Sequence, residues 1–159
     1  MSTIKTDMGF KSRQGLRGLA CIQLFGADGK LKEERLIENT ITELMDAQVA
    51  DQMSDQTDAA IGYMSVGTGS GQIASDTGLD VTLDRNALTS TTQGAAGADN
   101  DVVYVGTWAV ADGTGAITEA GIMRLDDDAT LMTYAEFDVI NKGAADSLVI
   151  TWTVTFGAS

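Results

Sequence analysis

The stretch that decides the fold lies close to the end of the chain and reads Leu148-Val-Ile-Thr-Trp-Thr-Val-Thr-Phe156. Its large apolar side chains fall at every second position: Leu148, Ile150, Trp152, Val154 and Phe156. Successive side chains of a β-strand point to opposite sides of the sheet. The alternation therefore predicts a strand with one face in a hydrophobic core and a milder face, of valine and threonine, turned outward.

Similar runs recur outward from this strand, separated by turns rich in glycine and aspartate. Strands are predicted at residues 19–25, 30–37, 61–66, 79–83, 102–110, 117–125, 131–140 and 148–156. A hairpin turn is predicted at residues 26–29, which contain Asp-Gly, and a small, polar surface loop at residues 89–100. Short strands at this spacing are typical of an antiparallel β-sandwich or a jelly-roll-like barrel.

One amphipathic helix is predicted between the second and third of these strands. Thr40 and Glu43 have the spacing of a capping box, in which each side chain accepts a backbone N–H of the first turn. Apolar residues then recur at helical spacing, at Ile41, Leu44, Met45, Val49 and Met53. We expect the helix to end near Ser54-Asp55 and to pack this stripe against the sheet. A parallel α/β fold needs several such helices, so the chain is predicted to be mainly β.

The length of 159 residues is that of one ordinary domain, and the net charge is −13. Four basic residues nevertheless lie near the start of the chain, against one acid: Lys5, Lys11, Arg13 and Arg17. We therefore divide the chain into a basic N-terminal arm, residues 1–17, and one β-sandwich domain, residues 18–159. The arm is interpreted either as a docking segment for an acidic neighbour or as a short solvated terminus.

The strongly acidic balance argues against nucleic acid and anionic membranes as partners. No apolar run has the length of a membrane span, and the first residues lack the apolar centre of a signal peptide, so synthesis in a host cytoplasm is expected. Cys21 lies inside the apolar run of residues 19–25, and we expect it to be buried in the core rather than to act as a reactive thiol.

Residues with the chemistry of a catalytic or metal site are few. The chain has no histidine, which excludes Ser-His-Asp and Cys-His systems and the usual zinc ligand set. Glu119 lies within an apolar strand beside a glycine, and we interpret it as a structural carboxylate that caps backbone donors. Residues 67–71, Gly-Thr-Gly-Ser-Gly, lack the Lys-Ser/Thr of a phosphate-binding loop and are interpreted as a turn.

Two acidic turns could offer oxygen ligands to calcium. Asp126, Asp127 and Asp128 are the weak metal candidates, and Asp99-Asn-Asp101 is a second such turn, but neither has the spacing of an EF-hand loop. A solvated acidic turn is the default interpretation of both. We predict no catalytic residue, no cofactor and no enzymatic activity.

Several segments, taken in order, resemble a broad group of tailed-phage virion proteins that includes capsid decoration (cement) and tail-associated proteins. These segments are Asn39-Thr-Ile-Thr42, Tyr63-Met-Ser-Val-Gly-Thr-Gly69, Ser75-Asp-Thr-Gly-Leu79 with Arg85, Ile117-Thr-Glu-Ala-Gly-Ile122 and Leu148–Phe156. The resemblance implies a virion location, a β-sandwich or jelly-roll-like fold and self-association on a symmetric particle. It carries no shared catalytic residues.

Because the chain is short and has no shaft-like repeat, we expect a decoration protein on the capsid exterior that binds and stabilises the assembled shell. Its expected partners are the major capsid protein and copies of itself, as a trimer or dimer. The subunit contacts are expected at Lys5, Lys11, Arg13 and Arg17. The alternatives are a tail, baseplate or tail-fibre component, and a carbohydrate- or calcium-binding β-sandwich module.

Overall fold

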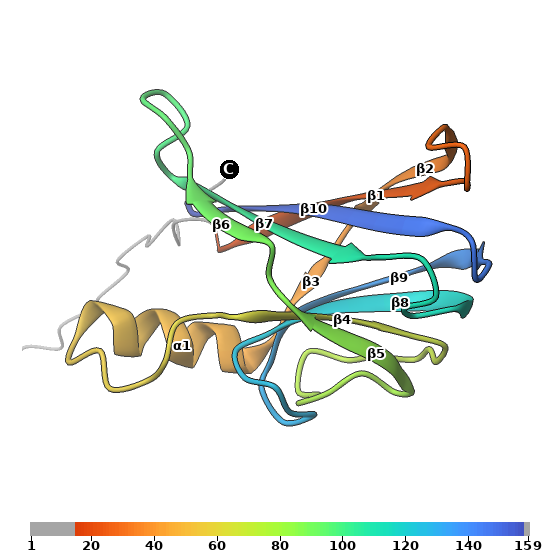
Figure 1. Cartoon of the computed structure of the whole chain (residues 1–159). Helices are drawn as coiled ribbons and strands as arrows, with labels where there is room; N and C mark the ends of the chain where they lie inside the picture. The colour runs from red at the N-terminus through yellow and green to blue at the C-terminus, as the bar shows by residue number, and fades with distance from the viewer. Residues whose placement is uncertain (1–14, 158–159) are drawn as a thin grey trace, which may run out of the picture.

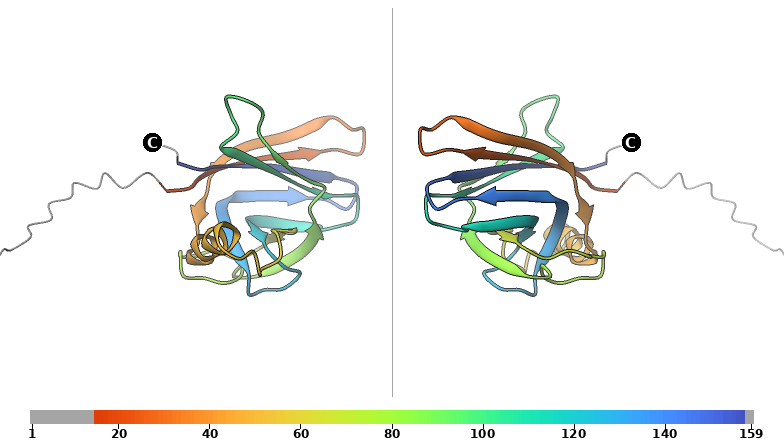
Figure 2. Two further views of the ribbon diagram at one scale, coloured as in Figure 1. Left: turned by 90° about the vertical axis from the view of Figure 1, so that its left-hand side faces the viewer. Right: turned by 90° about the vertical axis from the view of Figure 1, so that its right-hand side faces the viewer.

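The protein is a sandwich of two antiparallel sheets of five strands each, seen one above the other in Figure 1. The computed structural model describes residues 15–157. Half of the chain is in strands and one short helix is present in the described part, so the predicted mainly β class and β-sandwich are confirmed. Views turned by 90° about the vertical axis show the two sheets as separate layers (Figure 2). The helix lies beside the lower of the two layers.

The first sheet, sheet A, has the strand order β2-β1-β10-β7-β6. Its strands are β1 Arg17–Phe25, β2 Leu31–Glu38, β6 Ser90–Gln93, β7 Asp101–Trp108 and β10 Ser147–Thr155. The strand with the clearest alternation, β10, is the central one and pairs with β1 and β7. Its large apolar side chains, Leu148, Ile150, Trp152 and Val154, are all fully buried as predicted.

The second sheet, sheet B, has the strand order β3-β9-β8-β4-β5. Its strands are β3 Thr40–Ile41, β4 Tyr63–Gly67, β5 Thr82–Ala87, β8 Gly115–Met123 and β9 Leu131–Lys142. The inner faces of both sheets form one core, in which the largest side chains are Trp108 and Trp152. Sheet-on-sheet packing of this kind buries every second residue of each strand.

The chain crosses from sheet A to sheet B at Asn39. The backbone N–H of Asn39 donates to the carbonyl of Gly18 at 3.1 Å, and its side-chain amide donates to the Thr133 hydroxyl. A Cβ on Gly18 would stand 2.0 Å from the Asn39 side-chain oxygen. Glycine at this position therefore allows the linking residue to pass close over the edge of sheet A.

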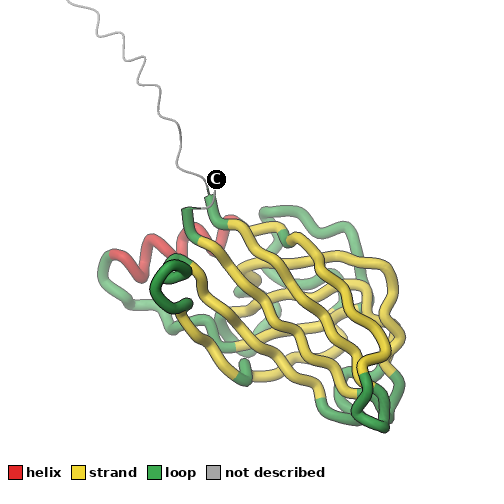
Figure 3. Tube along the Cα trace, turned by 90° about the horizontal axis from the view of Figure 1, so that it is seen from above, coloured by secondary structure: helices red, strands yellow, loops and turns green. Residues whose placement is uncertain are grey.

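The helix α1 spans Glu43–Met53 and lies at one end of the sandwich, as Figure 3 shows from above. The helix ends at Met53 with Ser54 as its C-cap residue, in agreement with the prediction, but the predicted capping box is wrong. The N-cap residue is Thr42, and the Thr42 hydroxyl donates to the carbonyls of Leu131 and Met132 instead of accepting from the first turn. Thr40 belongs to β3.

The apolar stripe of the helix is only partly buried. Met45 is almost completely buried, whereas Met53 is 83% exposed at the last position of the helix. Three strands depart clearly from the prediction. β3 lies where the helix was predicted to begin, and β5 begins at Thr82 instead of residue 79. β6 lies within residues 89–100, which were predicted as a loop because they are small and polar.

Candidate functional site

The outer face of sheet A is the candidate binding surface of this protein. It is formed by the side chains that alternate with the core residues of β1, β2, β7 and β10. Its uncharged members include Leu19, Cys21, Gln23, Leu36, Val103, Val105, Thr107, Val149, Thr151, Thr153 and Thr155. Leu36 is 63% exposed and Leu19 43% exposed. Among residues 15–157, no other helix or strand lies over this face (Figure 1).

The strand register sets these side chains in straight rows. Leu19 lies level with Thr153 and Val103, and Cys21 lies level with Thr151 and Val105. One row further toward the chain ends, Arg17 lies level with Thr155 and Asp101. The rows of Leu19 and Cys21 on β1, β10 and β7 are therefore uncharged. Arg17 and Asp101 lie at one end of the face, and Glu34 and Glu38 lie on β2 at its edge.

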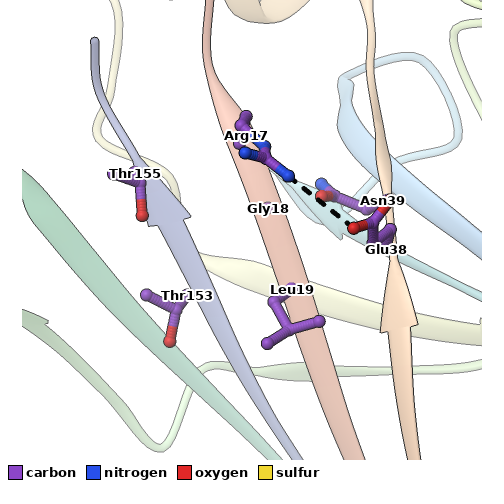
Figure 4. A pocket seen from close by; sticks show the side chains of 7 residues that line it. All are labelled: Arg17, Gly18, Leu19, Glu38, Asn39, Thr153 and Thr155. Carbon is purple, nitrogen blue, oxygen red and sulfur yellow. Dashed lines mark ion pairs between the residues drawn. The ribbon is translucent and has the colours of Figure 1, made fainter. Parts of the chain in front are cut away.

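A shallow hollow of about 490 Å³ lies at this end of the face (Figure 4). It is lined by Arg17, Gly18, Leu19, Glu38, Asn39, Thr153 and Thr155. The Arg17 guanidinium and the Glu38 carboxylate form an ion pair at 3.7 Å, with both side chains largely exposed. An exposed pair of this kind contributes little to stability, so its groups can exchange partners at low cost.

The corresponding outer face of sheet B is covered by the chain itself. The loop of residues 68–81 lies against it, and Leu79 packs with Met123, Leu131 and Tyr134 in a second, smaller apolar cluster. The Tyr134 hydroxyl donates to the carbonyl of Gln72 in the same loop at 2.8 Å. The loop thus covers part of the outer face of sheet B, whereas no such loop covers the outer face of sheet A in the described part of the chain.

Glu119 holds this loop in place. Its side chain is fully buried, and its Oε1 atom accepts the backbone N–H groups of Gly69 and Val81, both at 2.9 Å. Its Oε2 atom accepts the Gln72 side-chain amide at 3.0 Å and the Asp80 N–H at 3.2 Å. The prediction that Glu119 caps backbone donors is confirmed.

The glycines of the Val-Gly-Thr-Gly segment make room for this carboxylate. A Cβ on Gly67 would stand 2.5 Å from Glu119 Oε1, and one on Gly69 would stand 2.8 Å from the same atom. Larger residues at either position would push the loop away from the sheet. Gly67 is the last residue of β4, and residues 68–71 leave the strand without regular structure, so the predicted turn begins one residue later than expected.

The acidic turn of residues 126–128 is occupied by interactions within the chain. Asp126 and Asp128 both pair with the Arg85 guanidinium, which also donates to the Ser65 hydroxyl at 3.0 Å. Desolvation alone would raise the pKa of Asp127, but hydrogen bonds from Thr130 and Ala129 and nearby arginines outweigh it and lower that pKa. Among residues 15–157, no group of three or more Cys, Asp or Glu side chains is placed to hold a metal ion.

Asp146, like Asp127, is held by hydrogen bonds from its own part of the chain and by a basic side chain. Asp146 accepts the Gly143 N–H at 2.8 Å and the Lys32 ammonium at 3.0 Å. The backbone hydrogen bond first, and Lys32 second, lower the pKa of Asp146. The ammonium of Lys142 is buried beside it and donates to the carbonyls of Asp146 and Ala109.

The predicted contact residues fall on both sides of the described boundary. Lys5, Lys11 and Arg13 lie outside the described residues. Arg17 lies in β1, at the end of the outer face of sheet A, and the adjacent Leu16 packs against the core. The described fold thus begins before the predicted boundary at residue 18.

The expectation that Cys21 is buried in the core is wrong. Cys21 is half-buried on the outer face of sheet A, because Ala20, Ile22 and Leu24 occupy the inner face of β1. Desolvation, and then the charge of Glu34, raise the pKa of its thiol.

Sequence reasoning did not identify the outer face of sheet A as a surface. The valines and threonines of residues 148–156 and 102–107 did indicate an outward strand face without charge. The pairing of β1 with β10 was needed to place Leu19 and Cys21 in the same surface.

The fold and this surface define a β-sandwich protein with one sheet face available for binding. Comparison of the chain with protein-family models, with curated proteins and with solved structures found no match. No helix within residues 15–157 combines the length and apolar character needed to cross a bilayer.

Proposed function

We propose that this chain is a non-catalytic structural protein of a tailed-phage particle, which decorates the outside of the assembled capsid and stabilises it by binding. The observation that carries the proposal is the uncharged centre of the outer face of sheet A, on β1, β10 and β7, in a chain with a net charge of −13. A flat, partly apolar sheet face suits contact with another protein surface better than the enclosure of a small molecule.

The segments that resemble tailed-phage virion proteins support the same proposal. Three of them, residues 63–69, 75–79 and 117–122, meet where Glu119 fixes the loop of residues 68–81 on sheet B. In this proposal the segments that carry the resemblance maintain the fold and cover part of sheet B. The outer face of sheet A and the basic arm are then the parts that bind partners.

In the proposed mechanism the arm attaches the sandwich to the shell. Residues 1–14 hold Lys5, Lys11 and Arg13 against Asp7, so the rest of the chain carries a net charge of −15. A basic segment next to an acidic body favours contact with an acidic patch on a neighbouring capsid subunit. Because the protein would bind only the assembled shell, binding stabilises that state by mass action, and many copies on one shell add avidity.

The test uses purified empty shells and the full-length chain. The informative deletion removes residues 1–14 and keeps Leu16 and Arg17, which belong to the folded domain. We expect the deleted chain to remain folded by circular dichroism and to lose co-sedimentation with shells. A matched variant, Lys5→Gln with Lys11→Gln and Arg13→Gln, keeps the arm length and should show the same loss if charge is responsible.

Unchanged shell occupancy after the deletion would contradict the role of the arm. The position on the particle is tested separately by imaging particles that carry a labelled copy. Decoration over the whole shell is the expected result, whereas one axial spot would indicate the alternative tail or baseplate component.

A further inference from the structure

We propose that the outer face of sheet A is the surface on which a second copy of this chain docks, face to face, about a two-fold axis parallel to β10. The inference rests on the proposed function for its biological setting, although the free protein suffices to test it. It commits to one occupant of the face, an identical sheet.

The charge distribution favours this face for self-association. Outside residues 1–14 the chain carries a net charge of −15, so two copies repel each other at most orientations. The centre of this face holds only uncharged side chains, among them Val149, Thr151 and Thr153 of β10. Copies that meet here bring no like charges together at the centre of the contact.

The strand register makes the face complementary to itself. A two-fold axis parallel to the central strand β10 leaves the position of each residue along the strand direction unchanged. It places β1 of one copy opposite β7 of the other. Leu19 then lies opposite Val103 of the second copy, because both lie level with Thr153. Cys21 lies opposite Val105 of the second copy for the same reason.

The charged end of the face is complementary as well. Arg17 and Asp101 both lie level with Thr155, on the two sides of β10. In the proposed dimer each Arg17 therefore lies opposite Asp101 of the second copy, and the pair forms twice. Glu38, which is level with Leu19, lies opposite the uncharged Thr92. Complementary charges at a rim fix the register of an interface.

The size of the face is sufficient for a dimer. Strands about 4.8 Å apart, with about 3.3 Å per residue, give a face of roughly 600 Å² per copy. The two copies together would bury about 1,200 Å², the lower limit of standard-size protein interfaces. Packed sheets lie about 10 Å apart with aligned strands, which the exposed leucine, valine and threonine side chains can fill.

The first experiment measures the mass of the full-length chain by size-exclusion chromatography with light scattering. Between about 1 and 100 µM, the range in which interfaces of this size begin to associate, we expect twice the chain mass of 16.6 kDa. Thr151 lies on the proposed axis and faces its own copy. Thr151→Lys should therefore raise the dimer Kd by about a hundredfold or more, because two ammonium groups meet across the axis.

Val139→Lys is the matched control, since Val139 is 44% exposed on a strand of sheet B, away from this face. It should leave the dimer intact. A wild-type chain that stays monomeric or forms trimers over this range would overturn the inference. So would a Thr151→Lys chain that dimerises as tightly as the Val139→Lys control.

A charge-reversal pair tests the register without disturbing the centre of the face. Arg17→Asp and Asp101→Arg should each weaken the dimer by about tenfold, and the double variant should regain most of the affinity. Failure of the double variant to recover would reject the proposed two-fold geometry. A dimer that does not bind shells would reject the proposed function alone, and a monomer that decorates shells would reject this inference alone.

Discussion

Replacement of the buried Glu119 by glutamine is the sharpest test of how the loop over sheet B is held. Glu119→Gln keeps the shape of the side chain but changes one oxygen into an amide donor. The remaining oxygen can still accept from Gly69 and Val81. The new amide nitrogen would face two donors, the Asp80 N–H and the Gln72 side-chain amide.

The magnitude follows from these contacts. Hydrogen bonds to a charged acceptor contribute about 1.5–3 kcal/mol each and neutral ones about 0.5–1.5 kcal/mol. Among the described residues no donor reaches the buried Oε1 of Gln72, so its amide can rotate and accept from the new glutamine. What remains is the weakening of two bonds and the loss of the one from Asp80. A neutral glutamine also escapes the desolvation cost of a buried carboxylate, which offsets part of these losses. We expect a net loss of about 2–3 kcal/mol in the free energy of unfolding.

The assay is urea unfolding followed by circular dichroism, with the melting temperature as a second measurement. For a chain of this length the expected loss corresponds to a decrease of about 5–10 °C in Tm. The matched control is Glu136→Gln on the facing strand, where the exposed carboxylate accepts one backbone N–H, from Gln72. It should cost less than about 1 kcal/mol. Equal stability of Glu119→Gln and wild type would refute the view that this carboxylate anchors the loop.

Two further predictions concern protonation. Asp127 and Asp146 have pKa values lowered from 3.8, so the stability they contribute is complete above that pH and is lost as the pH falls through their folded values. The free energy of unfolding should therefore decrease below about pH 4, and the decrease should be shallower in Asp146→Asn; an identical pH profile for the two chains would contradict this assignment. Burial raises the pKa of Tyr104 to about 12, so Tyr104→Phe should remove a step near that pH from a spectrophotometric tyrosine titration. Loss of a step near the ordinary value of 10.0 instead would show that the phenol is accessible.

The strands of the second half of the chain could be predicted because their patterns are strong. In β10, every second residue is a large apolar side chain, and a half-buried strand is the structure that gathers such residues on one face. The role of Glu119 could also be inferred, since a lone carboxylate in an apolar strand must find donors. Both inferences use only neighbouring residues in the sequence.

The wrong predictions concern residues whose structure is decided by contacts distant in the sequence. The Thr40–Glu43 spacing fits a capping box, but the N-cap residue is Thr42. Its hydroxyl donates to carbonyls of β9 that lie 89 and 90 residues away in the sequence. The run of residues 19–25 is apolar on both sides, so the pattern alone does not say which face of β1 holds Cys21. The polar strand β6 has no alternation at all and exists because β7 offers it a free edge. Each of these depends on a partner distant in the sequence.

The pairing of β1 with β10 has a consequence for biosynthesis. The first strand of the described fold lies between β2 and a strand made about 130 residues later, with Arg17 paired to Thr155. While the ribosome is still translating, β1 and β7 each lack a neighbour, and the two halves of sheet A cannot join until residues 147–155 emerge. Such a high contact order slows folding and leaves two bare strand edges on the nascent polypeptide. Chaperone capture or early aggregation of incomplete chains is the hazard that this topology creates.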